Sequence, residues 1–114
     1  MKRLLLFICI SFSITLYSQN KIESSVEELY DGTTWVNSEG INYEYDSNNN
    51  LKTETFYTWE SSSWDKYLKI VYTYNLENKV TKAVDYFWDT DSGQFELSYR
   101  IVYTYNTNGN LTEI

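Results

Sequence analysis

The chain has 114 residues, of which 18% are aromatic and 22% are charged, and its formal net charge is −7 at pH 7. Such an acidic chain is not expected to bind nucleic acid, because that binding depends on the neutralisation of phosphates by Lys and Arg. The length corresponds to one modest domain, whose core must be built largely from aromatic side chains.

Residues 1–18 have the pattern of a signal peptide. A short basic start precedes an apolar run at residues 4–16, and Ser18 offers a small residue for cleavage. The apolar run is shorter than the about 20 residues that a membrane-spanning helix requires. We therefore expect cleavage between Ser18 and Gln19, passage through the periplasm, and a secreted or cell-surface location.

The segment that remains, residues 19–114, has seven basic and sixteen acidic residues, which gives a formal net charge of −9. It contains no Cys, His, Met or Pro. Disulfides and metal sites with thiolate or imidazole ligands are therefore excluded from this segment. We expect no cofactor and no enzymatic activity, because no recognisable nucleophile, acid–base pair or phosphate-binding glycine loop is present.

The same segment contains an internal repeat. The hexapeptide IVYTYN occurs at residues 70–75 and again at residues 101–106. Shifts of 29 and then 31 residues bring aromatic positions of successive copies into register, as with Trp35, Trp64 and Phe95. The copies cover about residues 20–48, 49–77 and 78–108, and residues 109–114 begin a fourth.

Each copy has the pattern of two strands. Apolar and polar residues alternate along WDKYLKIVYTY, residues 64–74, and along VTKAVDYFW, residues 80–88. These segments predict an all-β fold: an antiparallel meander of six strands plus a stub, forming a curled sheet or partial barrel. One face of the second copy is expected to carry Trp64, Leu68, Ile70, Tyr72 and Tyr74.

Two kinds of turn alternate along the chain. YDSNNNL, YNLENKV and YNTNGNL predict three-residue hairpin loops, each a type I turn closed by a residue with positive φ: Asn49, Asn78 or Gly109. The other turns are polar, and they are expected to bring together the pairs Tyr30 and Trp35, Trp59 and Trp64, and Trp88 and Phe95.

The hairpin loop at residues 75–79 also predicts a strand register. With Asn75 opposite Lys79, a regular ladder places Tyr74 opposite Val80, Tyr72 opposite Lys82, Ile70 opposite Val84, Leu68 opposite Tyr86, and Lys66 opposite Trp88. The last of these pairs predicts a cation–π contact worth about 0.5–1 kcal/mol.

The segments YEYDSNNNL and YTYNTNGNL resemble the YD, or RHS-type, repeats of bacterial secreted and surface proteins. The wider unit, with a serine-rich turn between two Trp residues, is similar to repeats in secreted proteins of Bacteroidota. The resemblance covers all of residues 19–114 and implies an exported protein. Because the autoproteolytic core motif of RHS proteins does not occur, we do not expect a large toxin-enclosing shell.

The chain ends within a repeat, whereas such Bacteroidota relatives often end in a sorting domain. We therefore expect a fragment of a longer array. An uncapped repeat edge is also expected to self-associate, because it offers unpaired backbone groups to a second chain.

The aromatic face allows two functional interpretations. It either forms the core of a protein used for surface display, adhesion or structural spacing, or it is a platform that binds glycans. The expected partners are accordingly a polysaccharide or another cell-surface protein. The candidate ligand-binding residues of the platform are Trp35, Trp59, Trp64 and Trp88.

Two loops, DSNNNL at Asp46 and DTDSG at Asp89, have part of the oxygen-ligand spacing of a calcium loop. Turn chemistry alone explains Asp and Asn at these positions, so we expect no metal site. Membrane insertion is not expected either, because Lys66 and Lys82 lie on the strand face that would meet lipid.

Overall fold

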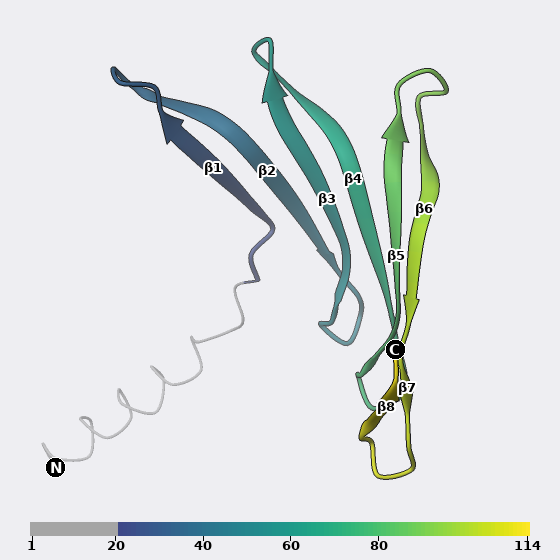
Figure 1. Ribbon diagram of the computed structural model, residues 1–114. Helices are drawn as coiled ribbons and strands as arrows, with labels where there is room; N and C mark the ends of the chain where they lie inside the picture. Colours follow the sequence, from purple (N-terminus) through teal and green to yellow (C-terminus); the bar gives the residue numbers. More distant parts are fainter. Residues whose placement is uncertain (1–20) are drawn as a thin grey trace, which may run out of the picture.

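The computed structural model describes residues 21–114 as an open antiparallel sheet (Figure 1). Its strands pair in chain order, and the sheet is not closed into a barrel, which confirms the expected all-β meander. The expected signal peptide lies outside the described residues. The six strands are β1 (Ser24–Tyr30), β2 (Trp35–Tyr45), β3 (Leu51–Glu60), β4 (Ser63–Tyr74), β5 (Val80–Asp89) and β6 (Gln94–Val102).

A small second sheet continues the first one at its C-terminal end. It consists of β7 (Thr104–Tyr105) and β8 (Leu111–Glu113). Between β6 and β7, the backbone N–H of Tyr103 donates to the carbonyl of Thr81 in β5 at 2.9 Å. This hairpin is the expected stub.

Three equivalent turns close one end of the sheet, and they confirm the predicted conformations. Asn49, Asn78 and Gly109 have φ values of 69°, 59° and 76°. In the first turn, Oδ1 of Asp46 accepts the backbone N–H groups of Asn48 and Asn50 at 2.8 and 2.9 Å. In the other two turns, the side-chain oxygens of Asn75 and Asn106 accept hydrogen bonds from the two equivalent backbone N–H groups.

A β-bulge follows each of these turns and shifts the strand register. Tyr74 faces Val80 as predicted, but Thr73 faces Lys82, so Thr81 is an extra residue. The predicted register is therefore wrong beyond its first pair. The observed partners are Tyr72 and Ala83, Ile70 and Asp85, Lys69 and Tyr86, and Leu68 and Phe87. Equivalent extra residues are Lys52 and Thr112.

A second set of bulges divides the aromatic residues between the two faces of the sheet. In β4, Tyr57 faces Lys66 and Phe56 faces Leu68, so Tyr67 is the extra residue. The ammonium groups of Lys66 and Lys69 both stand over the ring of Phe95, which places these lysines on one face. Because neighbours alternate, Ile70 lies on the other face. The expectation that Trp64 shares a face with Leu68, Ile70, Tyr72 and Tyr74 is therefore wrong.

The single layer buries few side chains. Within residues 21–114, the least exposed are Ala83, Val84 and Thr53, at 6%, 7% and 7%. At the centre of one face, the hydroxyl of Tyr72 donates to Glu54 at 2.7 Å. Burial is the main reason why the pKa of Tyr72 lies well above its usual value, and this hydrogen bond raises the pKa further. No helix in the described part of the chain is long and apolar enough to cross a membrane.

Candidate functional site

Three hairpin tips form the end of the sheet opposite the asparagine turns. Each tip joins two aromatic side chains across its strands, as predicted. The ring centroids are 5.5 Å apart for Tyr30 and Trp35, 4.9 Å for Trp59 and Trp64, and 5.0 Å for Trp88 and Phe95.

The three tips separate from one another (Figure 1). The last backbone pair between the first and second hairpins is Glu39 with Thr58, and the last between the second and third is Leu68 with Phe87. Beyond these pairs, each strand is paired only within its own hairpin. No backbone pairing therefore joins one aromatic tip to the next within residues 21–114.

The aspartates of the outer tips are engaged by their own turns. Oδ1 of Asp31 accepts the N–H groups of Thr34 and Thr33 at 2.9 and 2.8 Å, and these bonds lower its pKa. Hydrogen bonds from Ser92 and Asp91 lower the pKa of Asp89 in the same way. Within residues 21–114, no group of three or more His, Cys, Asp or Glu side chains is placed to hold a metal ion.

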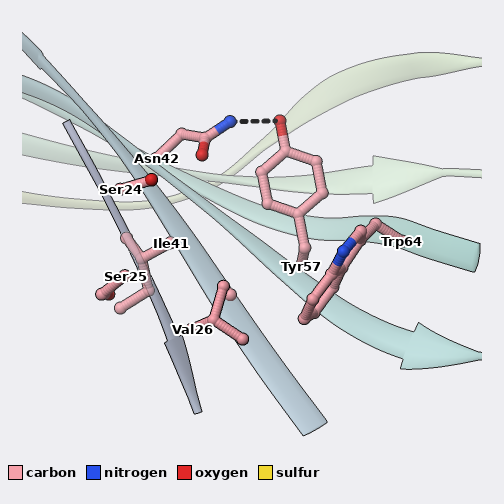
Figure 2. A pocket seen from close by; sticks show the side chains of 8 residues that line it. Ser24, Ser25, Val26, Ile41, Asn42, Tyr57 and Trp64 are labelled. Atoms are coloured by element: carbon pink, nitrogen blue, oxygen red, sulfur yellow. Dashed lines mark hydrogen bonds between the residues drawn. The ribbon is translucent and has the colours of Figure 1, made fainter. Parts of the chain in front are cut away.

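A first hollow lies between the first and second hairpins (Figure 2) and has a volume of about 220 Å³. The amide nitrogen of Asn42 donates to the hydroxyl of Tyr57 at 3.4 Å. A Cβ at Gly40 would lie 3.2 Å from the indole of Trp64, so glycine lets this ring rest on β2. The hollow is lined by Ser24, Ser25, Val26, Gly40, Ile41, Asn42, Tyr57 and Trp64.

A second hollow, of about 610 Å³, lies between the second and third hairpins. Nζ of Lys66 stands 4.0 Å from the ring centroid of Trp88, so the predicted cation–π contact is confirmed although the register differs. The hollow is lined by Tyr57, Glu60, Trp64, Asp65, Lys66, Trp88 and Thr90. Tyr57 and Trp64 line both hollows, and we call the two together the aromatic furrow.

The four tryptophans do not form one row. Trp64 and Trp88 line the aromatic furrow, whereas Trp59 packs edge-on against Trp64. Trp35 stays on the first tip, 65% exposed. Sequence reasoning missed Tyr57 and Asn42, which come from two different hairpins. An isolated glycine within a strand pattern, Gly40, was a usable signal for close approach of another group.

The family of the chain is shown by its match at residues 34–114 to a model described as "Family of unknown function (DUF3836)". The chain belongs to this family. The interpretation as a YD or RHS-type repeat is wrong, because no such family is indicated. The short motif behind it, an aromatic strand followed by an Asn-rich turn, is what any tight hairpin with a positive-φ residue requires.

Solved structures of this family share the fold. A DUF3836 protein from Parabacteroides distasonis is 20% identical, with a TM-score of 0.63, over 73% of this chain and 79% of that one. One from Bacteroides vulgatus is 25% identical, with a TM-score of 0.58, over 70% and 83%. A protein of unknown function from Bacteroides fragilis is 17% identical, with a TM-score of 0.53, over 81% and 78%. No curated protein matches the chain.

Proposed function

We propose that this chain is an exported, non-enzymatic β-repeat protein used for surface display, adhesion or structural spacing. The observation that carries the proposal is one hydrogen bond that occurs at three equivalent places. The hydroxyls of Tyr45, Tyr74 and Tyr105 donate to the carbonyls of Ile22, Leu51 and Val80 at 2.9, 2.6 and 2.7 Å.

Each of these bonds joins the later part of one copy to the start of the same copy, 23 or 25 residues earlier. Backbone pairing of β2 with β3 and of β4 with β5 then joins each unit to its neighbour, as in proteins built from stacked repeats. Such a sheet extends in one direction and projects its aromatic tips from one end. These properties suit a spacer or an adhesive surface.

Export is tested with the full chain and a variant without residues 1–18, both carrying a C-terminal epitope and produced in a Bacteroidota host. The full chain should be digested by protease added to intact cells or be recovered from the medium, and the shortened variant should remain protected. A cytoplasmic protein serves as the control for lysis. Equal protection of both forms would contradict the proposal.

Glycan binding is a second candidate function, favoured by the aromatic furrow. Ligand sites are typically concave, lined by aromatic side chains and supplied with a few polar groups. A glycan array followed by tryptophan fluorescence tests it: saturable quenching by a glycan supports binding, and an array without hits contradicts it. Mass spectrometry of the bound glycan also tests the non-enzymatic proposal, because shortened products would contradict it.

A further inference from the structure

The two hollows of the aromatic furrow lie on one face of the sheet. Tyr57 is paired with Gly40 on β2 and with Lys66 on β4. Directly opposite residues in an antiparallel sheet share a face, so all three face the same way. Because Lys66 also covers Trp88 of β5, the furrow runs across the strands from the first hairpin to the third.

Its rim is open and polar. Glu60, Asp65, Lys66 and Thr90 are all exposed. The larger hollow, about 610 Å³, lies within the range of about 300–1,000 Å³ that is usual for ligand sites. An open furrow that crosses several strands admits a long molecule from the side, so it does not require a free chain end.

We propose that the aromatic furrow binds a linear, uncharged polysaccharide whose successive segments occupy the two hollows on either side of Tyr57 and Trp64. The inference rests on the second candidate function and names its ligand class. The half-buried rings of Trp64 and Trp88 line the furrow, and aromatic side chains are a common lining of ligand sites.

Polar groups are present in both hollows. Ser24 and Asn42 lie at the first, and Glu60, Asp65 and Thr90 lie at the second. Carboxylates accept hydrogen bonds from hydroxyl groups, and these charge-assisted bonds are stronger than neutral ones. A polyol chain therefore finds acceptors along the whole furrow.

The charge of the site separates neutral from acidic glycans. Lys66 is the only cation among the lining residues of the two hollows, and its ammonium group is already over the ring of Trp88. Glu60 and Asp65 line the same hollow, and residues 19–114 carry a formal net charge of −9. A polyanion is repelled by this field, whereas an uncharged chain is not.

Isothermal titration of the purified exported protein tests the proposal, with linear neutral gluco- and manno-oligosaccharides from disaccharide to hexasaccharide and with polygalacturonate. We expect affinity to rise at least about tenfold with chain length. Asn42→Ala and Trp88→Ala, which alter opposite hollows, should each remove most of this gain. Trp35→Ala, outside the furrow, should leave it unchanged.

Circular dichroism and urea melts establish that each variant is folded, and Thr90→Val replaces Trp88→Ala if the latter is not. Affinity that does not depend on chain length, or tighter binding of polygalacturonate, would overturn the proposal that a linear, uncharged polysaccharide occupies both hollows. Such a result would leave the candidate function of glycan binding in place. No binding of any glycan by the parent protein would overturn both. The protease test of export is independent of either result.

Discussion

The two ends of the sheet hold neighbouring hairpins together in different ways. At the asparagine-turn end, backbone pairing joins neighbouring hairpins up to the turn, as Tyr74 pairs with Val80, and a tyrosine hydroxyl closes its own hairpin, as Tyr74 does with Leu51 at 2.6 Å. At the tip end, backbone pairing stops at Leu68 and Phe87, and side chains such as Lys66 over Trp88 make the connection. The difference indicates that contacts at the turn end stabilise the sheet, whereas the proposed binding site lies at the tip end.

Polar contacts between successive turns strengthen the same end. The side chain of Lys21 donates to Asn49, and that of Asn50 donates to Asn78 at 2.9 Å. Nζ of Lys79 donates to the carbonyl of Gly109 at 2.6 Å. In the last two of these contacts, the residue that follows the positive-φ residue of one turn contacts the positive-φ residue of the next turn.

Removal of the turn-end tyrosine hydroxyls is expected to have the largest effect. Replacing Tyr45, Tyr74 and Tyr105 together with Phe should lower the free energy of unfolding by about 3 kcal/mol, because each bond contributes about 1 kcal/mol and distant sites add. Urea melts measure the change. Tyr43→Phe is the control, since its hydroxyl meets the exposed Ser25 hydroxyl at 3.1 Å and no backbone carbonyl in the described part of the chain. An equal loss per hydroxyl in the control would contradict a special role for the hydroxyl–carbonyl bonds at the turn end.

A pair of glycines compares the two ends directly. Gly109, in a turn, and Gly93, at a tip, both have positive φ, at 76° and 66°. Gly109→Ala should cost about 1 kcal/mol, because alanine tolerates this region poorly and its Cβ would displace the ammonium group of Lys79. Gly93→Ala meets no neighbouring atom and should cost less in the same melts. The reverse order would contradict the stabilising role of the turn contacts.

Acid sensitivity should depend partly on the first turn. The hydrogen bond from the backbone N–H of Asn50 is the main reason why the pKa of Asp46 is lowered. A lowered pKa contributes stability that is present above the unfolded value of about 3.9 and is lost as pH falls through the folded value. Asn75 fills the same position in the second turn with the same acceptor atom.

Asp46→Asn should therefore leave the thermal unfolding midpoint unchanged at pH 7. It should also make the decrease of this midpoint between pH 7 and about pH 3 smaller than in the parent protein. The remaining fall should come from Asp31 and Asp89, whose pKa values are also lowered. Thermal melts at both pH values measure this, and an undiminished fall in the variant would show that Asp46 is not one of the groups responsible.

The smallest effect is expected for Trp35→Ala. This side chain is 65% exposed and packs mainly on Tyr30, with ring centroids 5.5 Å apart. The free energy of unfolding should change by no more than about 0.5 kcal/mol, as for most exposed substitutions. A loss above about 2 kcal/mol in urea melts would mean that the first tip stabilises the sheet after all.

The turns were predictable because their chemistry is local. Asn49, Asn78 and Gly109 were expected at positive φ from four or five neighbouring residues each, and the structure agrees. The register was not predictable from the same information. Thr81 is an ordinary strand residue in sequence, and nothing near it indicates that it forms a bulge whose hydroxyl bonds the carbonyl of Thr73 at 3.1 Å.

The candidate site shows the same limit. Trp64 and Trp88 were recognised as candidates from their residue type, and both line the aromatic furrow. Trp35 was grouped with them although it lies on a separate tip, because the separation of the tips depends on where backbone pairing stops. Tyr57 and Asn42 meet only when two hairpins lie side by side.

The sequence by itself determined the all-β meander, the turn positions and the aromatic pairs at the tips, because alternation and turn preference act over a few residues. Only the tertiary structure decided which face each aromatic occupies and how the hairpins separate. One extra residue in a strand reverses every side chain beyond it. Pairing between hairpins, not local preference, decides where that residue is accommodated.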